Sequence, residues 1–137
     1  MKTSLELSQA RLQDLESIHQ FLDEFAQHAA LADTITFAMR LAIEEVFVNL
    51  VEHGYEHAPG AVGITLQSSP DRVTVMIRDH APPFPPEKAP RPQLDQAWQT
   101  RQVGGLGWHF IREMMDEIEY RSDPAQGNIL TLVKRIG

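Results

Sequence analysis

Glu45 and Asn49 stand one helical turn apart in an otherwise largely apolar segment, EEVFVNLVEHGY. At about 100° per residue they project from one face of a helix. A carboxylate and an amide oxygen at this spacing are hard ligands that suit Mg²⁺, and the carboxylate could alternatively orient or deprotonate an attacking hydroxyl. Glu45 could instead pair locally while Asn49 hydrogen-bonds a neighbouring backbone group, as such residues do on ordinary helix surfaces.

Asp79 ends the segment RVTVMIRD. Strand side chains alternate between the two faces, so Asp79 shares the apolar face of Val73, Val75 and Ile77. A carboxylate on that face needs hydrogen-bond donors. An exocyclic amine such as that of adenine would be one, and the backbone N–H groups of a local turn are the alternative.

A third motif is the glycine-rich turn Gly104-Gly105-Leu106-Gly107, which precedes a predicted helix. Glycines allow backbone N–H groups to approach phosphate oxygens, and a helix N-terminus favours negative charge. The turn lacks the Gly-Lys-Ser/Thr of a Walker A loop, and it lacks the preceding strand and third glycine of a dinucleotide-binding motif. A flexible loop before a helix is the alternative interpretation.

A zinc site is a weaker hypothesis. Its candidate ligands are Glu52, His53, Glu56 and His57. Their spacing differs from His-Glu-x-x-His, and Gly54 would interrupt the helix that should hold them rigid. The chain has no cysteine, which excludes disulfides and thiol chemistry within it.

Hydrophobic periodicity predicts the elements that position these residues. A short strand over residues 3–8 precedes an amphipathic helix over residues 12–29. A second helix is expected from about Ile35 to His53, capped by Asp33 or Thr34 and ended by a left-handed Gly54. Its core face comprises Ile35, Met39, Ala42, Ile43, Val46 and Leu50.

The second half of the chain predicts strands and one more helix. Residues 61–67 and 72–78 are predicted to form a hairpin joined by SSPD, and residues 108–115 a helix. Residues 116–121 and 128–136 are predicted to form strands around a DPAQGN turn. Between them, six prolines in residues 82–92 exclude regular structure and predict a lid over about residues 82–103. The order predicts a single domain over residues 1–137, of α+β class, a two-layer sandwich with a largely antiparallel sheet.

Composition supports a soluble globular domain. The chain has 137 residues, of which 42% are hydrophobic and 23% charged. Its net charge of −7 argues against general binding to nucleic-acid backbones. No segment approaches the roughly 18 consecutive apolar residues of a membrane span, and no signal peptide is evident. We therefore expect a cytoplasmic protein that binds neither nucleic acid nor membrane.

Taken in order, the three motifs resemble those of the Bergerat-fold (GHKL, histidine kinase-like) ATPase superfamily. The segment EEVFVNLVEHGYE resembles its N box, RDHAPPFPP its first glycine box, and GGLGWHFIREMMDEIEYR its second. His-Gly-Tyr after the N box, Pro-Phe after the aspartate and Met-Asp-Glu-Ile-Glu-Tyr after the glycines are similar to the anti-sigma factor serine kinases. This resemblance implies the Bergerat fold, an α/β sandwich over a mixed sheet.

The resemblance also implies roles for individual residues. Glu45 would be the catalytic base, Asn49 would coordinate Mg²⁺, and Asp79 would bind the adenine amine of ATP. Gly105 and Gly107 would hold the phosphates, and Arg101 in the lid would reach the terminal phosphate. The remaining predicted nucleotide-binding positions are His53, Ala81, Gly104 and Leu106.

The implied function is an ATP- and Mg²⁺-dependent serine/threonine kinase. Its substrate would be a STAS-domain anti-anti-sigma protein, and it would sequester a sigma factor and form a homodimer. Histidine-kinase chemistry would need an additional helix pair that carries the phosphoacceptor histidine. The alternative from another class is a catalytically weak nucleotide-binding interaction module.

Two positions depart from the family pattern. Ala81 stands where the first glycine box usually has glycine, so that a methyl group occupies the place where the backbone normally approaches the nucleotide. Trp108 replaces a smaller aliphatic residue after the last glycine. The size and apolar character of tryptophan favour a place in the core for Trp108, with a place beside the nucleotide as the alternative.

Overall fold

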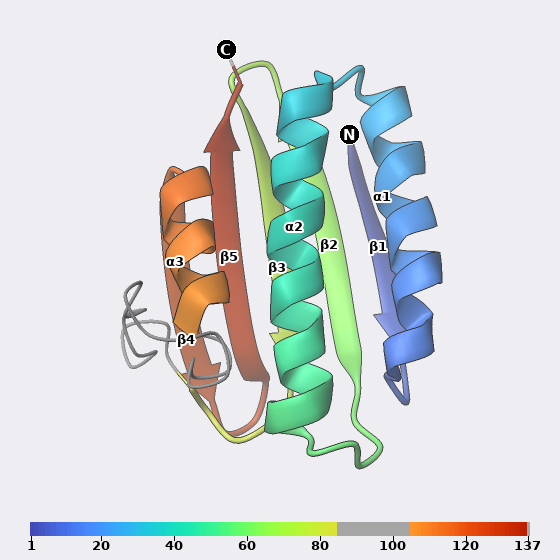
Figure 1. Ribbon diagram of the computed structural model, residues 1–137, viewed down its shortest axis with the longest axis vertical. Coiled ribbons are helices and arrows are strands. Elements are labelled where there is room, and N and C mark those ends of the chain that lie inside the picture. The colour runs from blue at the N-terminus through green and yellow to red at the C-terminus, as the bar shows by residue number, and fades with distance from the viewer. Residues whose placement is uncertain (85–104, 137) are drawn as a thin grey trace.

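The computed structural model describes residues 1–84 and 105–136, with the side chains of residues 105–107 excepted. The chain forms a five-stranded sheet with helices on one face (Figure 1). In chain order the elements are β1 (Lys2–Leu7), η1 (Leu12–Asp14), α1 (Leu15–His28), α2 (Asp33–Asn49), η2 (Leu50–Gly54), β2 (Val62–Ser69), β3 (Arg72–Asp79), α3 (Gly105–Met114), β4 (Glu117–Asp123) and β5 (Gly127–Arg135). None of these helices is long and apolar enough to cross a membrane.

The strand order is β1-β2-β3-β5-β4, and each neighbouring pair of these strands is antiparallel. The predicted α+β class, two-layer sandwich and largely antiparallel sheet are thus confirmed. The mixed sheet implied by the resemblance is not found among the described strands. β4 does run in the same direction as β3, but β5 lies between them, so the connection through α3 creates no parallel neighbours.

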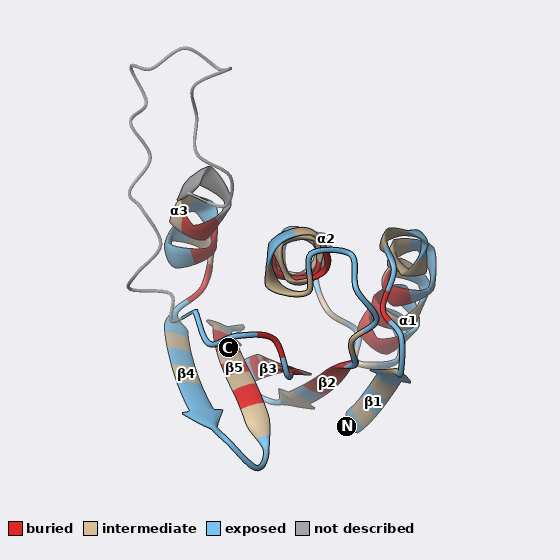
Figure 2. Cartoon of the chain, turned by 90° about the horizontal axis from the view of Figure 1, so that it is seen from below, coloured by how far each residue is buried: buried red, intermediate tan, exposed pale blue. Residues whose placement is uncertain are grey.

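The core lies between the sheet and the helix layer. Figure 2 shows α1, α2 and α3 on the same face of the sheet. Along β3 the residues Val73, Val75 and Ile77 are buried and alternate with more exposed ones, as the period of two predicts. The predicted face of α2 also packs on the core: Met39, Ala42, Ile43 and Val46 are buried, whereas Ile35 and Leu50 are partly buried.

The two ends of the second helix differ from the prediction. Its N-cap is Ala32, which makes no side-chain cap hydrogen bond, and Asp33 is the first helical residue. There its carboxylate still lies where the helix dipole favours negative charge. At the other end α2 continues into the π-helical turn η2, in which the Tyr55 N–H donates to the Leu50 carbonyl at 2.7 Å.

Gly54 does not adopt the predicted left-handed conformation. The positive φ angles in this region belong instead to Glu56, at 51°, and His57, at 63°. The π turn carries one more residue per turn than an α-helix, so the chain reverses after Gly54 rather than at it. The His57 N–H closes this reversal by donating to the Val51 carbonyl at 2.8 Å.

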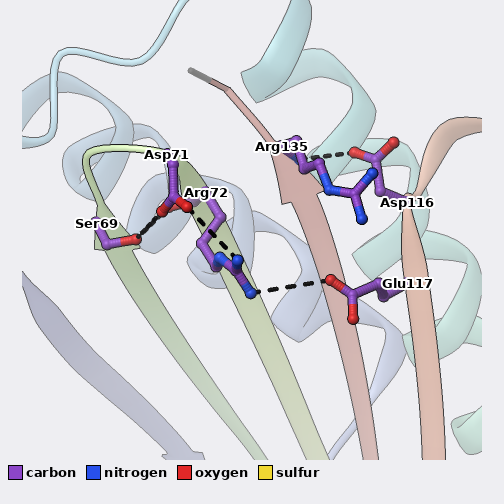
Figure 3. Close-up of polar contacts among 6 residues, drawn as sticks. All are labelled: Ser69, Asp71, Arg72, Asp116, Glu117 and Arg135. Atoms are coloured by element: carbon purple, nitrogen blue, oxygen red, sulfur yellow. Dashed lines mark hydrogen bonds and ion pairs between the residues drawn. The ribbon is translucent and has the colours of Figure 1, made fainter.

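Charged groups gather at the end of the sheet that holds the β2–β3 turn and the end of β5 (Figure 3). Arg72 lies directly opposite Arg135 across β3 and β5. Acids surround this like-charged pair: Asp71 is 3.5 Å and Glu117 3.9 Å from Arg72, and Asp116 accepts a hydrogen bond from the Arg135 backbone at 2.6 Å. The acids offset the repulsion that two facing cations would otherwise produce.

Candidate functional site

A cavity of about 440 Å³ lies at the opposite end of the sheet, where α2 and η2 meet the end of β3 and the start of β5. This volume falls in the usual range for small-molecule sites. Its lining combines apolar side chains with a few polar ones. The described lining residues are Val46, Asn49, Leu50, His53, Gly54, Glu56, Ile77, Asp79, Ala81, Pro82, Pro83, Phe84, Trp108, Tyr120, Asn128 and Leu130.

The first pair of predicted site residues comes together at the edge of this cavity. The Asn49 amide nitrogen donates to a Glu45 oxygen at 3.3 Å, a long hydrogen bond across one turn of α2. Asn49 lines the cavity, whereas Glu45 lies one turn behind it and does not contribute to the described lining. The hydrogen bond to Glu45 uses the amide nitrogen of Asn49, and no described residue donates to its amide oxygen, which could therefore serve as a ligand.

Glu45 is an acid in an unfavourable place for charge. Partial burial raises the pKa of its carboxyl above the ordinary value of 4.5, and the hydrogen bond from Asn49 opposes that rise. The negative charges of Glu44 and Glu52 raise the pKa further. A partly desolvated carboxylate whose pKa stays raised despite its hydrogen bond is a candidate for proton transfer or cation binding.

Asp79 lies at the bottom of the cavity with 7% of its surface exposed. Its Oδ1 accepts from the Ala81 N–H at 2.9 Å and from the Asn128 amide at 2.8 Å. Burial raises its pKa above the ordinary value of 3.8, against the lowering effect of these two hydrogen bonds and of His80. The alternative of a local backbone donor is therefore observed for Oδ1, and the contact with an adenine amine stays a prediction for Oδ2.

Asn128 is a site residue that the sequence interpretation missed. It lies opposite Asp79 in the β3–β5 register and is 3% exposed. Its amide nitrogen also donates to the Ala81 carbonyl at 2.8 Å, and its amide oxygen accepts from Ser122 at 2.8 Å. A signal was present, since Asn128 shares its strand face with the buried Leu130 and Leu132, and an amide there needs partners.

The methyl group of Ala81 packs against Gly54. A Cβ added at Gly54 would lie 3.0 Å from the Ala81 Cβ and 3.5 Å from a Leu50 methyl. Ala81 is 6% exposed and is held at both its N–H and its carbonyl, so it has little room to shift. The departure from the family pattern at Ala81 is therefore accommodated by the absence of a side chain at Gly54.

Two tyrosines hold the segment that follows β3. The Tyr55 hydroxyl accepts from the His80 N–H at 2.7 Å and donates to the Ala61 carbonyl at 2.6 Å. The Tyr120 hydroxyl accepts from the Phe84 N–H at 3.1 Å. The sequence assigned neither tyrosine to the site, because the N–H groups that donate to their hydroxyls are distant in the chain.

His53 lines the cavity, whereas no residue of the glycine-rich turn belongs to its described lining. His53 is exposed and lines the cavity from η2. Gly105 begins α3, and Leu106 and Gly107 belong to its first turn. Trp108 is 7% exposed and belongs to the core, as predicted, and it also lines the cavity, so a place beside a nucleotide stays a prediction. Gly104, Arg101 and nearly all of the predicted lid lie outside the described residues.

The donor set fits a hard cation better than zinc. Among the residues that the structure describes, no group of three or more His, Asp or Glu side chains could enclose a metal ion. The zinc hypothesis for Glu52, His53, Glu56 and His57 therefore has no support. The free amide oxygen of Asn49 beside Glu45 suits Mg²⁺, which takes few protein ligands when it binds together with phosphates and water.

Comparison with known proteins gives consistent results. The pattern of the histidine kinase-like ATPase domain matches residues 8–134. An anti-sigma F factor of Thermoanaerobacter sp. (strain X514) is 28% identical over 100 residues, which cover 72% of this chain and 69% of that protein. A serine-protein kinase RsbW of Bacillus thuringiensis subsp. konkukian (strain 97-27) is 26% identical over 113 residues, which cover 75% and 71% respectively.

Among solved structures, the mycobacterial sensor histidine kinase MprB superposes with a TM-score of 0.50 at 15% identity, covering 98% of this chain and 97% of that one. At this identity the likeness concerns the fold alone. The domain match is the stronger finding, because it spans the helix of Glu45 and Asn49, the strand of Asp79 and the turn before α3. The chain therefore belongs to the histidine kinase-like ATPase domain family.

Proposed function

We propose that the protein is an ATP-dependent serine kinase of an anti-sigma partner-switching system. The observation that carries the proposal is the Glu45–Asn49 pair, hydrogen-bonded at 3.3 Å on the helix that enters a cavity with Asp79 at its base. The family membership and the names of two relatives, an anti-sigma F factor and a serine-protein kinase, support it.

The nucleoside would occupy the apolar part of the cavity. Val46, Leu50, Ile77 and Leu130 provide walls on which a base can pack. Asp79 would accept a hydrogen bond from the exocyclic amine of adenine through the oxygen that the local backbone does not use. A base without a donor at that edge would leave a buried carboxylate oxygen without a partner.

The phosphates would extend toward the first turn of α3 and Asn49. Backbone N–H groups of Gly105, Leu106 and Gly107 at a helix N-terminus favour anions. Asn49 would hold Mg²⁺ through its amide oxygen. Charge neutralisation of the phosphates is the chemistry that the bound ion supplies. Gly104, Arg101 and His53 stay predicted contacts within this proposal.

Glu45 would act on the serine hydroxyl of the partner. The hydroxyl oxygen attacks the γ-phosphorus, the bond from that phosphorus to the bridging oxygen breaks, and ADP leaves. The serine proton passes to Glu45, whose raised pKa makes the carboxylate a better proton acceptor. The protein contributes mainly positioning, since phosphoryl transfer needs little covalent chemistry from the enzyme.

The partner in this proposal is a STAS-domain anti-anti-sigma protein, with a sigma factor held on another surface and a homodimer as the assembly. The test is incubation with γ-labelled ATP, Mg²⁺ and candidate STAS-domain proteins, followed by detection of serine-linked label. We expect transfer by the wild type, a fall of about a hundredfold or more in Glu45→Ala, and loss of ATP binding in Asp79→Asn. Glu24→Ala, on the exposed side of α1, is the control.

The interaction-module alternative makes a different prediction for phosphate transfer. A module that only binds nucleotide and partner would retain its Mg-ATP affinity in Glu45→Ala and would transfer no phosphate even as wild type. If Glu45→Ala phosphorylates the partner as fast as the wild type does, the role given to Glu45 is wrong. Binding measured by calorimetry beside the transfer assay separates these cases.

A further inference from the structure

Asp79 lines the cavity, and the hydrogen bonds that it accepts from described residues all go to one of its two oxygens. Its Oδ1 accepts two hydrogen bonds, at 2.9 Å from the Ala81 N–H and at 2.8 Å from the Asn128 amide. Two donors fill the usual capacity of one carboxylate oxygen. Within the described part of the chain, Oδ2 receives no such bond. A ligand therefore meets Asp79 as a single acceptor.

Asn128 is fixed in the orientation that produces this arrangement. Its amide nitrogen faces two acceptors, Asp79 Oδ1 and the Ala81 carbonyl, both at 2.8 Å. The reverse orientation would turn the amide oxygen toward both of these acceptors. Ser122 donates to the amide oxygen at 2.8 Å and so completes the hydrogen bonds of a side chain that is 3% exposed. The direct cross-strand pairing of Asp79 with Asn128 sets the distance.

The number of free acceptors matters for base recognition. Adenine carries one exocyclic amine beside a ring nitrogen that only accepts hydrogen bonds. Guanine carries two adjacent N–H donors, which pair best with both oxygens of one carboxylate. A site with one free oxygen satisfies the single donor of adenine. It leaves one of the two donors of guanine buried without a partner, so that binding of guanine costs more free energy.

We propose that Asn128 is a specificity-determining residue, which makes Asp79 a single acceptor and thereby selects adenine over guanine nucleotides. This inference rests on the proposed nucleotide binding in the cavity and adds the residue that sets its selectivity. Ala81 contributes through its backbone N–H and carbonyl, so a substitution of its side chain leaves this part of the recognition in place.

The test compares dissociation constants for Mg-ATP and Mg-GTP by calorimetry in the wild type, Asn128→Ala and Ser122→Ala. We expect the wild type to prefer Mg-ATP by about a hundredfold or more. In Asn128→Ala, Oδ1 becomes partly free, and the preference should fall by about tenfold, through weaker ATP binding and stronger GTP binding. Thr131→Ala, on the outward face of the same strand, should change neither constant.

Ser122 provides a second variant whose side chain is exposed, so that folding is not at risk. Losing its hydrogen bond to the Asn128 amide should reduce the preference in the same direction, by about twofold to fivefold. If both variants weaken ATP and GTP equally, or leave the ratio unchanged, Asn128 is merely structural and the inference fails. If the wild type binds neither nucleotide, the proposed function itself fails.

Discussion

Asp79 and Glu45 are both acids whose pKa is raised, chiefly by burial. The two carboxylates differ in how they are held. Asp79 has two short hydrogen bonds on one oxygen, whereas Glu45 has one long hydrogen bond, at 3.3 Å from Asn49. The first arrangement suits a group that recognises a ligand without moving, and the second suits a group that exchanges a proton.

Asp79→Asn should stabilise the protein without nucleotide. Because the pKa of Asp79 is raised, the folded state binds more protons than the unfolded state between pH 3.8 and the raised pKa. Stability therefore falls as the pH rises through that interval, and the loss persists at pH 7. Asparagine keeps an oxygen that can accept both hydrogen bonds. We expect the free energy of unfolding at pH 7 to rise by about 0.5–2 kcal/mol.

The measurement is urea denaturation from about pH 4 to pH 8, with Glu24→Gln on α1 as a control for the loss of an exposed acid. Asp79→Asn should flatten the pH dependence, and the control should leave it unchanged. A variant less stable than the wild type at pH 7 would show that the hydrogen bonds to the charged carboxylate outweigh its desolvation.

At the scale of elements, the junction between α2 and the end of β3 shapes the cavity. The π turn η2 continues α2 and carries Gly54 against Ala81. Turns of this kind occur mostly as single interruptions of helices, frequently at functional sites. Two residues with positive φ, Glu56 and His57, follow it and are strained for side chains of their type.

Gly54→Ala tests this contact. An added methyl group would gain up to about 1 kcal/mol of helix propensity. It would also lie 3.0 Å from the Ala81 Cβ, whose backbone is tied to Asp79 and Asn128. Overpacking of this kind costs about 1–3 kcal/mol, so we expect a net loss of stability of about 1 kcal/mol.

Ala81→Gly provides the matched partner. In the Gly54→Ala background it removes the opposing methyl group, and the double variant should recover the stability lost by Gly54→Ala. The coupling free energy in this double-mutant cycle, measured by urea denaturation, should favour the double variant by about 1 kcal/mol. Additive effects of the two substitutions would mean that the neighbouring backbone moves apart without cost.

The helices and strands could be predicted from the sequence, whereas contacts between segments distant in the chain could not. Periodicity located the helices and strands because each buried face repeats locally, as Val73, Val75 and Ile77 do on β3. The prediction that Gly54 ends the helix in a left-handed conformation is wrong. The absence of a side chain at Gly54 is explained by its contact with Ala81, which is far away in the chain. The position of β5 between β3 and β4 likewise depends on pairing between distant segments.

The candidate site was predictable in part for the same reason. Glu45, Asn49 and Asp79 stand out because polar side chains interrupt apolar patterns. Asn128 interrupts one too, but its meaning comes from its cross-strand partner Asp79, which no local pattern reveals. Hydrogen bonds from distant backbone groups to the Tyr55 and Tyr120 hydroxyls leave no trace in sequence spacing.

At the scale of the whole molecule, the sheet has two chemically different ends. The cavity lies where β3 ends at Asp79, and the charged cluster of Figure 3 lies where β3 begins at Arg72. Seven residue steps along a strand separate them by about 23 Å. This distance is more than twice the screening length of physiological salt, so the two ends should act independently through electrostatics.

Glu117→Gln should therefore change stability without changing nucleotide affinity. Arg72 faces Arg135 across β3 and β5, and Glu117 is 3.9 Å from Arg72. Removing this negative charge leaves the repulsion between the two arginines less compensated. The free energy of unfolding should fall by about 0.2–1 kcal/mol, and the decrease should be smaller in 1 M salt. Glu119→Gln is the control, because Glu119 lies opposite Thr131 and forms an exposed ion pair with Arg121, at 3.5 Å, instead of facing the arginine pair.

Urea denaturation at low and high salt measures the first effect, and calorimetric titration with Mg-ATP measures the second. We expect the affinities of both variants to agree with the wild type within about twofold, since neither residue lies at the cavity. A larger change of affinity in Glu117→Gln alone would mean that β3 transmits a rearrangement from Arg72 to Asp79. The sheet would then couple its two ends instead of holding them as separate rigid surfaces.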